Sequence, residues 1–123
     1  MSTNVDYIDT SMLANLSQFL SAEKLQSLLQ RYIDDSNRLL EQLTSSLADN
    51  NADDSRRHVH SLKSTSANIG ANPLASVAAE LEEFARLKQL DKVTERLDEL
   101  KNLFTETNTT IAGLDIMQQQ QTG

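Results

Sequence analysis

Residues 56–71 read RRHVHSLKSTSANIGA. Within this stretch, small and apolar residues recur at spacings of three and four, at Val59, Leu62, Ser66 and Ile69. That period is typical of one buried face of an α-helix. Gly70 follows, and glycine most readily closes a helix with a left-handed cap. The stretch therefore predicts a helix that packs one side on a core and ends at Gly70.

The same periodicity extends over most of the chain, and no stretch alternates polar and apolar residues as a half-buried strand would. Ser21 is a candidate cap for a long leucine-rich helix, and Asn72-Pro73 indicate the N-cap and first residue of a later one. Five helices are expected: residues 9–20 (capped by Asp9 or Thr10), 21–47, 53–70, 72–90 and 93–114.

Four substantial amphipathic helices joined by short loops have one compact arrangement, the antiparallel bundle. We therefore predict an all-α fold, an antiparallel four-helix bundle with a short additional N-terminal helix. The bundle domain is assigned to residues 1–115, and residues 116–123 are expected to form a frayed, Gln-rich tail.

The composition restricts the class of protein. Lys and Arg number 11 against 18 Asp and Glu, a net charge of −7, which argues against nucleic acid or a membrane surface as the main partner. The chain has no cysteine, so it has no disulfide or thiolate metal site. Its N-terminus lacks the features of a signal peptide, and no run of apolar residues is long enough to span a membrane. We expect a cytoplasmic, monomeric protein.

The two histidines, His58 and His60, lie on the helix predicted over residues 53–70. At about 100° per residue, His60 points roughly 140° away from the centre of the buried face and His58 only roughly 60° away. His60 is therefore predicted to face solvent, and His58 to pack at the edge of the core. The pair is a poor metal site, since helical metal-binding pairs are three or four residues apart.

The helical neighbours of His60 suit an anion. They are Arg56, Lys63, Ser64 and Ala67, two cations and two small residues. An exposed imidazole is a competent nucleophile, and the cations would stabilise a phosphoryl group on its ring. A solvated helix face without chemistry would carry the same residues, so geometry alone leaves both interpretations open.

The run His60-Ser61-Leu62-Lys63-Ser64, continued to Gly70-Ala71, closely resembles the signature of histidine-containing phosphotransfer (HPt) domains. Leu74 and the pair Leu81-Glu82 resemble the following helix of that family, and the resemblance spans residues 8–110. It implies a four-helix bundle that relays phosphoryl groups between aspartates of receiver domains in two-component signal transduction.

The resemblance also implies roles for single residues. His60 would be the phosphorylated residue, Lys63 would stabilise the phosphoryl group, and Gly70 would be structural. Ser64 replaces a glycine common in the family, which leaves a partner slightly less room. Docking of an acidic receiver is expected on the exposed sides of the second and third helices, with four contact residues: Arg56, Arg57, Ser64 and Ala67.

The chain would thus be a phosphocarrier and not an enzyme. It would accept a phosphoryl group from a receiver domain, such as that of a hybrid sensor kinase, and pass it to another receiver. No Gly-rich nucleotide loop is present, so no cofactor of its own is expected, and Mg²⁺ is expected in the receiver partner. The starting methionine and the Gln-rich end favour a free-standing protein over a domain of a hybrid kinase.

Two alternatives belong to other classes: the dimerisation and phosphoacceptor hairpin of a histidine kinase, and a structural helical adaptor. Kinase hairpins typically have an acidic residue directly after the histidine and a proline five residues on, where this chain has Ser61 and Thr65. A di-iron bundle would need Glu-x-x-His pairs, and none occurs. The acidic run of Glu80, Glu82 and Glu83 indicates a solvated helix face with one family-like position.

Overall fold

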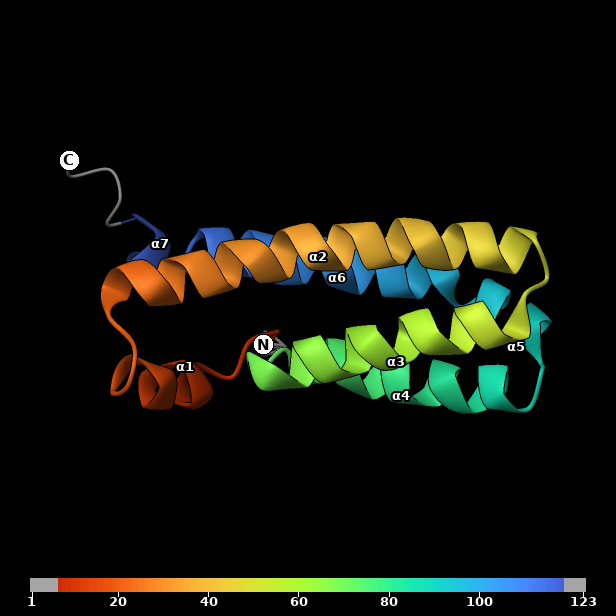
Figure 1. Ribbon diagram of the computed structural model, residues 1–123. Coiled ribbons are helices and arrows are strands. Elements are labelled where there is room, and N and C mark those ends of the chain that lie inside the picture. Colours follow the sequence, from red (N-terminus) through yellow and green to blue (C-terminus); the bar gives the residue numbers. More distant parts are fainter. Residues whose placement is uncertain (1–6, 119–123) are drawn as a thin grey trace, which may run out of the picture.

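The computed structural model describes residues 7–118, which form seven helices and no strand. Their bounds are α1 (Thr10–Ser17), α2 (Ala22–Ala48), α3 (Ala52–Asn68), α4 (Asn72–Arg86), α5 (Leu90–Glu95), α6 (Leu97–Ala112) and α7 (Asp115–Gln118). α2, α3, α4 and the α5–α6 segment run alternately in opposite directions, and α1 lies across the end where α2 begins (Figure 1). The predicted antiparallel four-helix bundle with a short N-terminal helix is confirmed.

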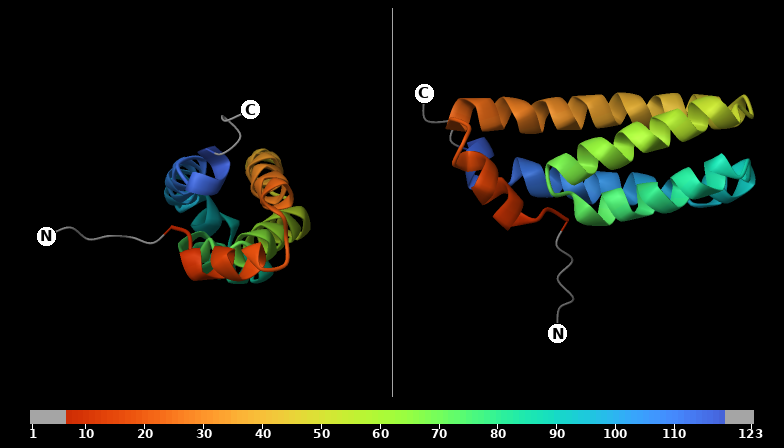
Figure 2. Two further views of the ribbon diagram at one scale, coloured as in Figure 1. Left: turned by 90° about the vertical axis from the view of Figure 1, so that its left-hand side faces the viewer. Right: turned by 60° about the horizontal axis from the view of Figure 1, so that its bottom comes forward.

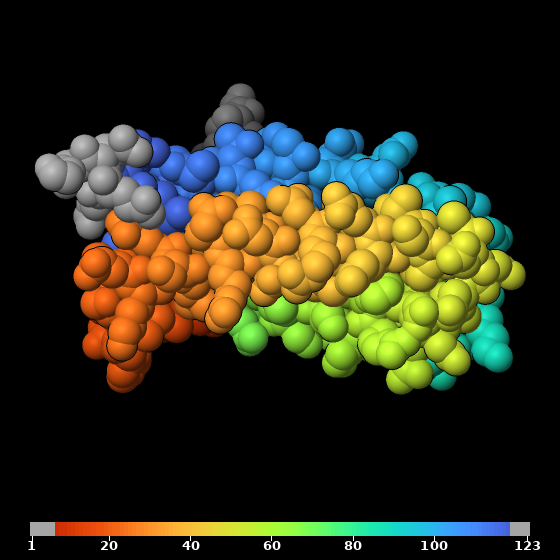
Figure 3. Space-filling view, turned by 45° about the horizontal axis from the view of Figure 1, so that its top comes forward, coloured from red at the N-terminus to blue at the C-terminus, as the bar shows by residue number. Residues whose placement is uncertain are grey.

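α3 is flanked by two neighbours, α2 on one side and α4 on the other (Figure 2). α6 completes the bundle behind them, and the space-filling view shows α2 lying along the surface between α3 and α6 (Figure 3). α3 therefore has three kinds of surface: one side in the core, two flanks against neighbours, and an outer side in water.

The core is built from aliphatic stripes. The side chains that are almost fully buried include Leu29, Leu43, Val59, Leu74, Leu81, Val93, Leu100 and Ile111. Burial of one such side chain contributes about 1.5–3 kcal/mol. The stripe predicted on α3 is confirmed, because Val59, Leu62 and Ser66 are buried and Ile69 follows them into the core. Burial of this stripe fixes the rotation of α3 about its own axis, so position 60 falls on the outside.

Hydroxyl pairs join α2 to α3 inside the bundle. Tyr32 Oη and Ser66 Oγ are 2.9 Å apart, and Ser46 Oγ and Ser55 Oγ are 2.7 Å apart. Burial raises the pKa of the Tyr32 phenol, so the hydroxyl stays protonated. Because buried polar groups are costly unless they are paired, these contacts favour one register of α3 along α2.

Gly70 makes the tight turn between α3 and α4. Its φ is +82°, in the left-handed region that glycine adopts without strain. A Cβ at this position would lie 3.1 Å from Met12 Cβ and 3.2 Å from the Asp9 carbonyl oxygen. The Gly70 carbonyl also accepts a 2.8 Å hydrogen bond from the Asp9 backbone N–H. The same residue therefore turns the chain and docks the segment that leads into α1.

Several predicted helix ends are confirmed. The Ser21 side chain accepts a hydrogen bond from the Lys24 backbone N–H, and the Asp9 side chain caps α1 in the same way through Ser11. The N-cap predicted at Asn72 is wrong by one residue, because Ala71 holds that position and Asn72 is the first helical residue. No cap hydrogen bond from a side chain is made there, and Pro73 lies in the first turn.

The C-terminal third differs from the prediction in three places. α4 ends at Arg86 and the break follows at Lys88, whose φ is +62°, before the predicted Leu90. The predicted single last helix is divided at Arg96, whose guanidinium bonds Glu80 of α4 and Glu99 of α6. Residues 116–118 of the predicted tail belong to α7, where the Ile116 carbonyl accepts a 2.6 Å bond from Gln26 Nε2, and residues 119–123 lie outside the described residues.

Replacement of Gly70 by alanine should destabilise the bundle by about 2 kcal/mol, because alanine is strained in the left-handed conformation and its Cβ would crowd Met12 Cβ and the Asp9 carbonyl oxygen. Urea unfolding followed by circular dichroism measures this loss. Gly113→Ala is the matched control, since Gly113 has φ −86° and its added Cβ makes only ordinary contacts. Equal stability of the Gly70 and Gly113 variants would contradict the role given to the turn.

Candidate functional site

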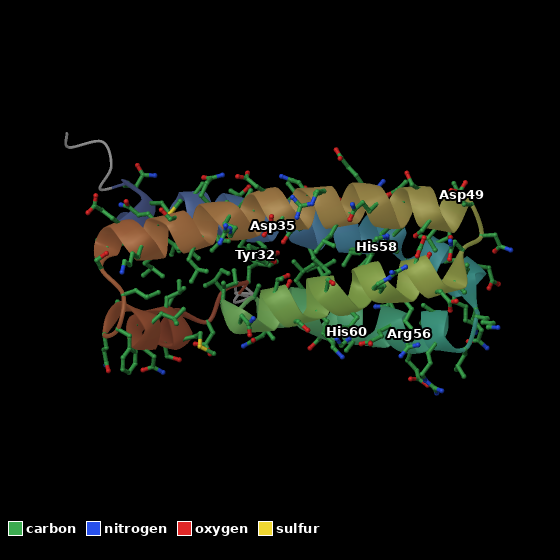
Figure 4. All side chains as sticks on the ribbon, viewed as in Figure 1. Tyr32, Asp35, Asp49, Arg56, His58 and His60 are labelled. Atoms are coloured by element: carbon green, nitrogen blue, oxygen red, sulfur yellow. The ribbon has the colours of Figure 1, made fainter. Side chains whose placement is uncertain are left out.

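His60 projects from the outer side of α3 toward α4, whereas His58 lies on the side of α3 that faces α2 (Figure 4). The His60 side chain is 56% exposed, which confirms its predicted orientation. Its Nδ1 lies 2.7 Å from Oε2 of Glu82 on α4. Within residues 7–118, no other group hydrogen-bonds the ring, so Nε2 is left available.

Lys63, one helical turn beyond His60, reaches the same carboxylate. Its Nζ lies 2.5 Å from Oε1 of Glu82. The Glu82 side chain is only 18% exposed and Lys63 is 35% exposed, so the contact is partly shielded from water. One carboxylate from α4 therefore uses one oxygen for the imidazole and the other for the ammonium group.

The electrostatics of Glu82 follow from this arrangement. Burial acts to raise the pKa of the Glu82 carboxyl, but hydrogen bonds and charge from Lys63 and His60 together outweigh it, and the pKa is lowered. An ionised carboxylate only accepts hydrogen bonds, so Nδ1 of His60 must be the donor. Glu82 thus selects the ring form that carries its proton on Nδ1 and leaves the lone pair of the neutral imidazole on Nε2.

The Glu82 contact has a simple origin in the α3–α4 hairpin. In an antiparallel pair joined by a tight turn, residues equally distant from the turn lie side by side. Counted from Ala71, His60 is 71 − 60 = 11 residues before the turn and Glu82 is 82 − 71 = 11 residues after it. Gly70 therefore fixes the register that brings the imidazole and the carboxylate together.

The sequence pattern alone missed this role, since it indicates a solvated face with one family-like position at Glu80, Glu82 and Glu83. The structure corrects this for Glu82 only. Glu80 bonds Arg96, and Glu83 bonds Arg86 on its own helix, both at exposed positions. The signal that distinguishes Glu82 is its distance from Gly70, which becomes informative only when the two helices are treated as a hairpin.

A surface hollow adjoins the imidazole. It is lined by Asp53, Arg56, Arg57, His60 and Glu82, all of them from α3 and α4. The helix beside the histidine in this hollow is therefore α4. The docking surface expected on the second and third helices stays a prediction. Residues of α2 line a different hollow that includes His58.

The predicted docking residues lie on exposed parts of α3. Arg56, Arg57, Ser64 and Ala67 are all exposed, and Arg57 forms an ion pair with Asp54 on the same helix. Arg56 makes no ion pair within residues 7–118 and stands one turn before His60. The structure thus brings His60, Lys63 and the two arginines to one side of the molecule, while their contact with a partner stays a prediction.

His58 does not share these properties. It is half-buried, as predicted, and burial together with the Arg57 charge lowers its pKa. No group of three or more histidine and carboxylate side chains in the described part of the chain is arranged to hold a metal ion. His58 therefore contributes to packing at the α2–α3 boundary.

The fold and this site define a class of protein, a helical bundle that presents an oriented imidazole on its surface. Comparison with known proteins gives the family. The model of the Hpt domain family matches residues 27–110, more than half of the chain. The chain therefore belongs to the Hpt domain family and has a phosphotransfer role in two-component signalling.

A solved relative agrees with this assignment over the whole length. The crystal structure of histidine-containing phosphotransfer protein B (HptB) from Pseudomonas aeruginosa PAO1 superposes with a TM-score of 0.84 and 27% sequence identity. The match covers 98% of this chain and 99% of that one. A search of curated proteins finds no match. None of the helices over residues 7–118 has the length and apolar character needed to cross a membrane.

The carboxylate bridge should make stability depend on pH. The ordinary pKa of glutamate is 4.5, and that of Glu82 is lowered in the folded protein. The contribution of the Glu82 bridge to the free energy of unfolding is therefore fully present above the pKa that Glu82 has in the unfolded chain. It is lost as the pH falls through the lower pKa that Glu82 has in the folded protein. We expect Glu82→Gln to be less stable than the wild type by about 0.5–1 kcal/mol at pH 7, with the two converging in acid.

Urea unfolding at a series of pH values between 7 and 3 measures this difference. Glu41→Gln on α2 controls for the loss of one negative charge, because Glu41 forms no ion pair within residues 7–118. A Glu82→Gln variant that differs from the wild type by the same amount at every pH would contradict the bridge.

Proposed function

We propose that His60 is the phosphorylated residue, and that it accepts a phosphoryl group on Nε2 from a receiver-domain aspartate and passes it to another receiver. The observation that carries the proposal is the bond between Nδ1 and Glu82, which leaves the other ring nitrogen of an exposed imidazole free. The Hpt family match supports a carrier over the kinase hairpin and the structural adaptor.

The reaction needs little chemistry from the chain itself. The Nε2 lone pair attacks the phosphorus of the aspartyl phosphate, the P–O bond breaks, and its electron pair goes to the receiver carboxylate. The ring becomes a cation that keeps its proton on Nδ1 and donates it to Glu82. In the reverse step a carboxylate oxygen of a receiver attacks the phosphorus, the P–N bond breaks, its electron pair returns to Nε2, and neutral imidazole leaves. Because Nδ1 carries that proton and donates it to Glu82 in both states, no proton has to move.

Positive charge assists the transfer. Phosphoryl transfer passes through a loose, in-line transition state, so catalysis consists of positioning and charge neutralisation. Lys63 would supply an ammonium group from one turn along α3, and Mg²⁺ would belong to the receiver. We further propose that no nucleotide site is involved and that the chain is a phosphocarrier, with the kinase activity on another protein or domain.

Docking would use the hollow beside His60. Arg56 and Arg57 line it, and Ser64 and Ala67 lie exposed beyond the imidazole on the same helix. The acidic aspartate site of a receiver would be attracted by the two arginines, which raises the rate of encounter more than the final affinity. The small side chains leave space for the receiver to approach the ring.

A transfer assay tests the proposal. The wild type, His60→Gln and His58→Gln are each incubated with a receiver domain that carries labelled phosphate. We expect label on the wild type and on His58→Gln, none on His60→Gln, and lability of the label in acid but not in base. Lys63→Ala should slow labelling by about tenfold, which corresponds to the loss of one charge-assisted hydrogen bond.

Two outcomes would contradict the proposal: a His60→Gln variant that is still labelled, and a label that base removes. ATP and Mg²⁺ without any receiver provide the control for the kinase alternative. Self-labelling under those conditions would favour a kinase hairpin.

A further inference from the structure

Glu82 does more than orient the histidine. The same carboxylate holds Lys63, the cation that a phosphoryl group on His60 would require, at 2.5 Å. An ammonium group has three protons, and in the unphosphorylated protein at least one of them is committed to Glu82 Oε1. Glu82, which orients the nucleophilic ring, therefore also binds Lys63, which would stabilise the phosphorylated product.

The geometry of the imidazole makes these two uses of Lys63 compete. Nδ1 and Nε2 lie on different edges of the ring and direct their bonds away from each other. Since Nδ1 faces Glu82, a phosphoryl group on Nε2 extends away from that carboxylate. Lys63 can reach the phosphoryl oxygens fully only by weakening its contact with Glu82.

We propose that Glu82 competes with the phosphoryl group for Lys63, and that this competition keeps phosphohistidine at position 60 short-lived and readily passed on. The inference rests on the proposed function of His60. Before phosphorylation, one carboxylate and one ammonium group neutralise each other. Phosphorylation adds about two negative charges on the phosphoryl group and one positive charge on the ring. The site therefore gains about one net negative charge while Glu82 and the phosphoryl group share one ammonium group, which raises the free energy of the phosphorylated state.

The other cations near the site do not remove this competition. Arg57 is paired with Asp54, and Arg86 and Arg96 are paired with Glu83 and Glu80. Arg56 can approach a phosphoryl group from the other side of His60 along α3, but it forms no ion pair with Glu82. Lys63 is thus the cation that Glu82 and the phosphoryl group share, and the chain is poised to pass the group on and not to store it.

The test compares Glu82→Gln with the wild type. Glutamine keeps the size of the side chain and an oxygen that accepts the Nδ1–H bond, but it removes the charge that holds Lys63. Each protein is phosphorylated by the same labelled receiver, the receiver is removed, and the loss of label from the histidine is followed. The partition of phosphate between the chain and the receiver at equilibrium is measured separately.

We expect the half-life of the phosphohistidine in Glu82→Gln to be about fivefold longer, and the equilibrium ratio of phosphorylated chain to phosphorylated receiver to rise about fivefold, the effect of a partly shielded ion pair. Glu83→Gln is the matched control, because it removes the same charge one residue away, from a side chain that pairs with Arg86. It should stay within about twofold of the wild type.

A second background separates competition for Lys63 from other effects of the charge. In Lys63→Gln, where there is no ammonium group to share, the Glu82→Gln substitution should change the half-life by less than half as much as it does in the wild-type background. An undiminished effect in that background would overturn the proposal, as would a Glu82→Gln half-life equal to or shorter than that of the wild type.

A measurement on the wild-type chain does not depend on how the variants fold. The ¹⁵N resonance of the Lys63 ammonium group should shift when His60 is phosphorylated, because the group exchanges Glu82 for the phosphoryl oxygens. An unchanged resonance would contradict the competition. A wild type that takes no label at all on His60 would instead contradict the proposed function, so the two failures are distinguishable.

Discussion

The turn at Gly70 is the constraint on which the rest of the site depends. Its left-handed backbone conformation and its contact with Asp9 and Met12 join α3 to α4 with a single register. That register places Glu82 beside His60, at equal distances from the turn. A longer loop or a displaced turn would change the register of α4 against α3 and move the carboxylate away from the imidazole.

The bundle supplies the other half of the positioning. Aliphatic side chains from every long helix fix the inward face of α3, and the hydroxyl pairs Tyr32–Ser66 and Ser46–Ser55 fix its position along α2. The outward face carries His60, Lys63 and Arg56 as a consequence. A rigid scaffold suits the proposed phosphocarrier, since phosphoryl transfer needs position and charge from the chain.

The sequence predicted those features that repeat within one helix. The stripe from Val59 to Ile69 gave the rotation of α3, and from it the exposure of His60 and the half-burial of His58. Features that depend on two helices were missed, because periodicity says nothing about the register between them, and Glu82 is the main example. The breaks at Lys88 and Arg96 were also misplaced, since neither position carries the glycine or proline that marks a helix end in sequence.

The central claim is that Glu82 holds Nδ1 of His60 and so assigns the phosphoryl group to Nε2. Nuclear magnetic resonance of the phosphorylated, ¹⁵N-histidine-labelled protein tests it most directly, because coupling between phosphorus and nitrogen identifies the bonded atom. We predict that phosphorus couples to Nε2 of residue 60 while Nδ1 keeps its proton. Coupling to Nδ1 of that ring, or phosphorus on any other residue, would contradict the account.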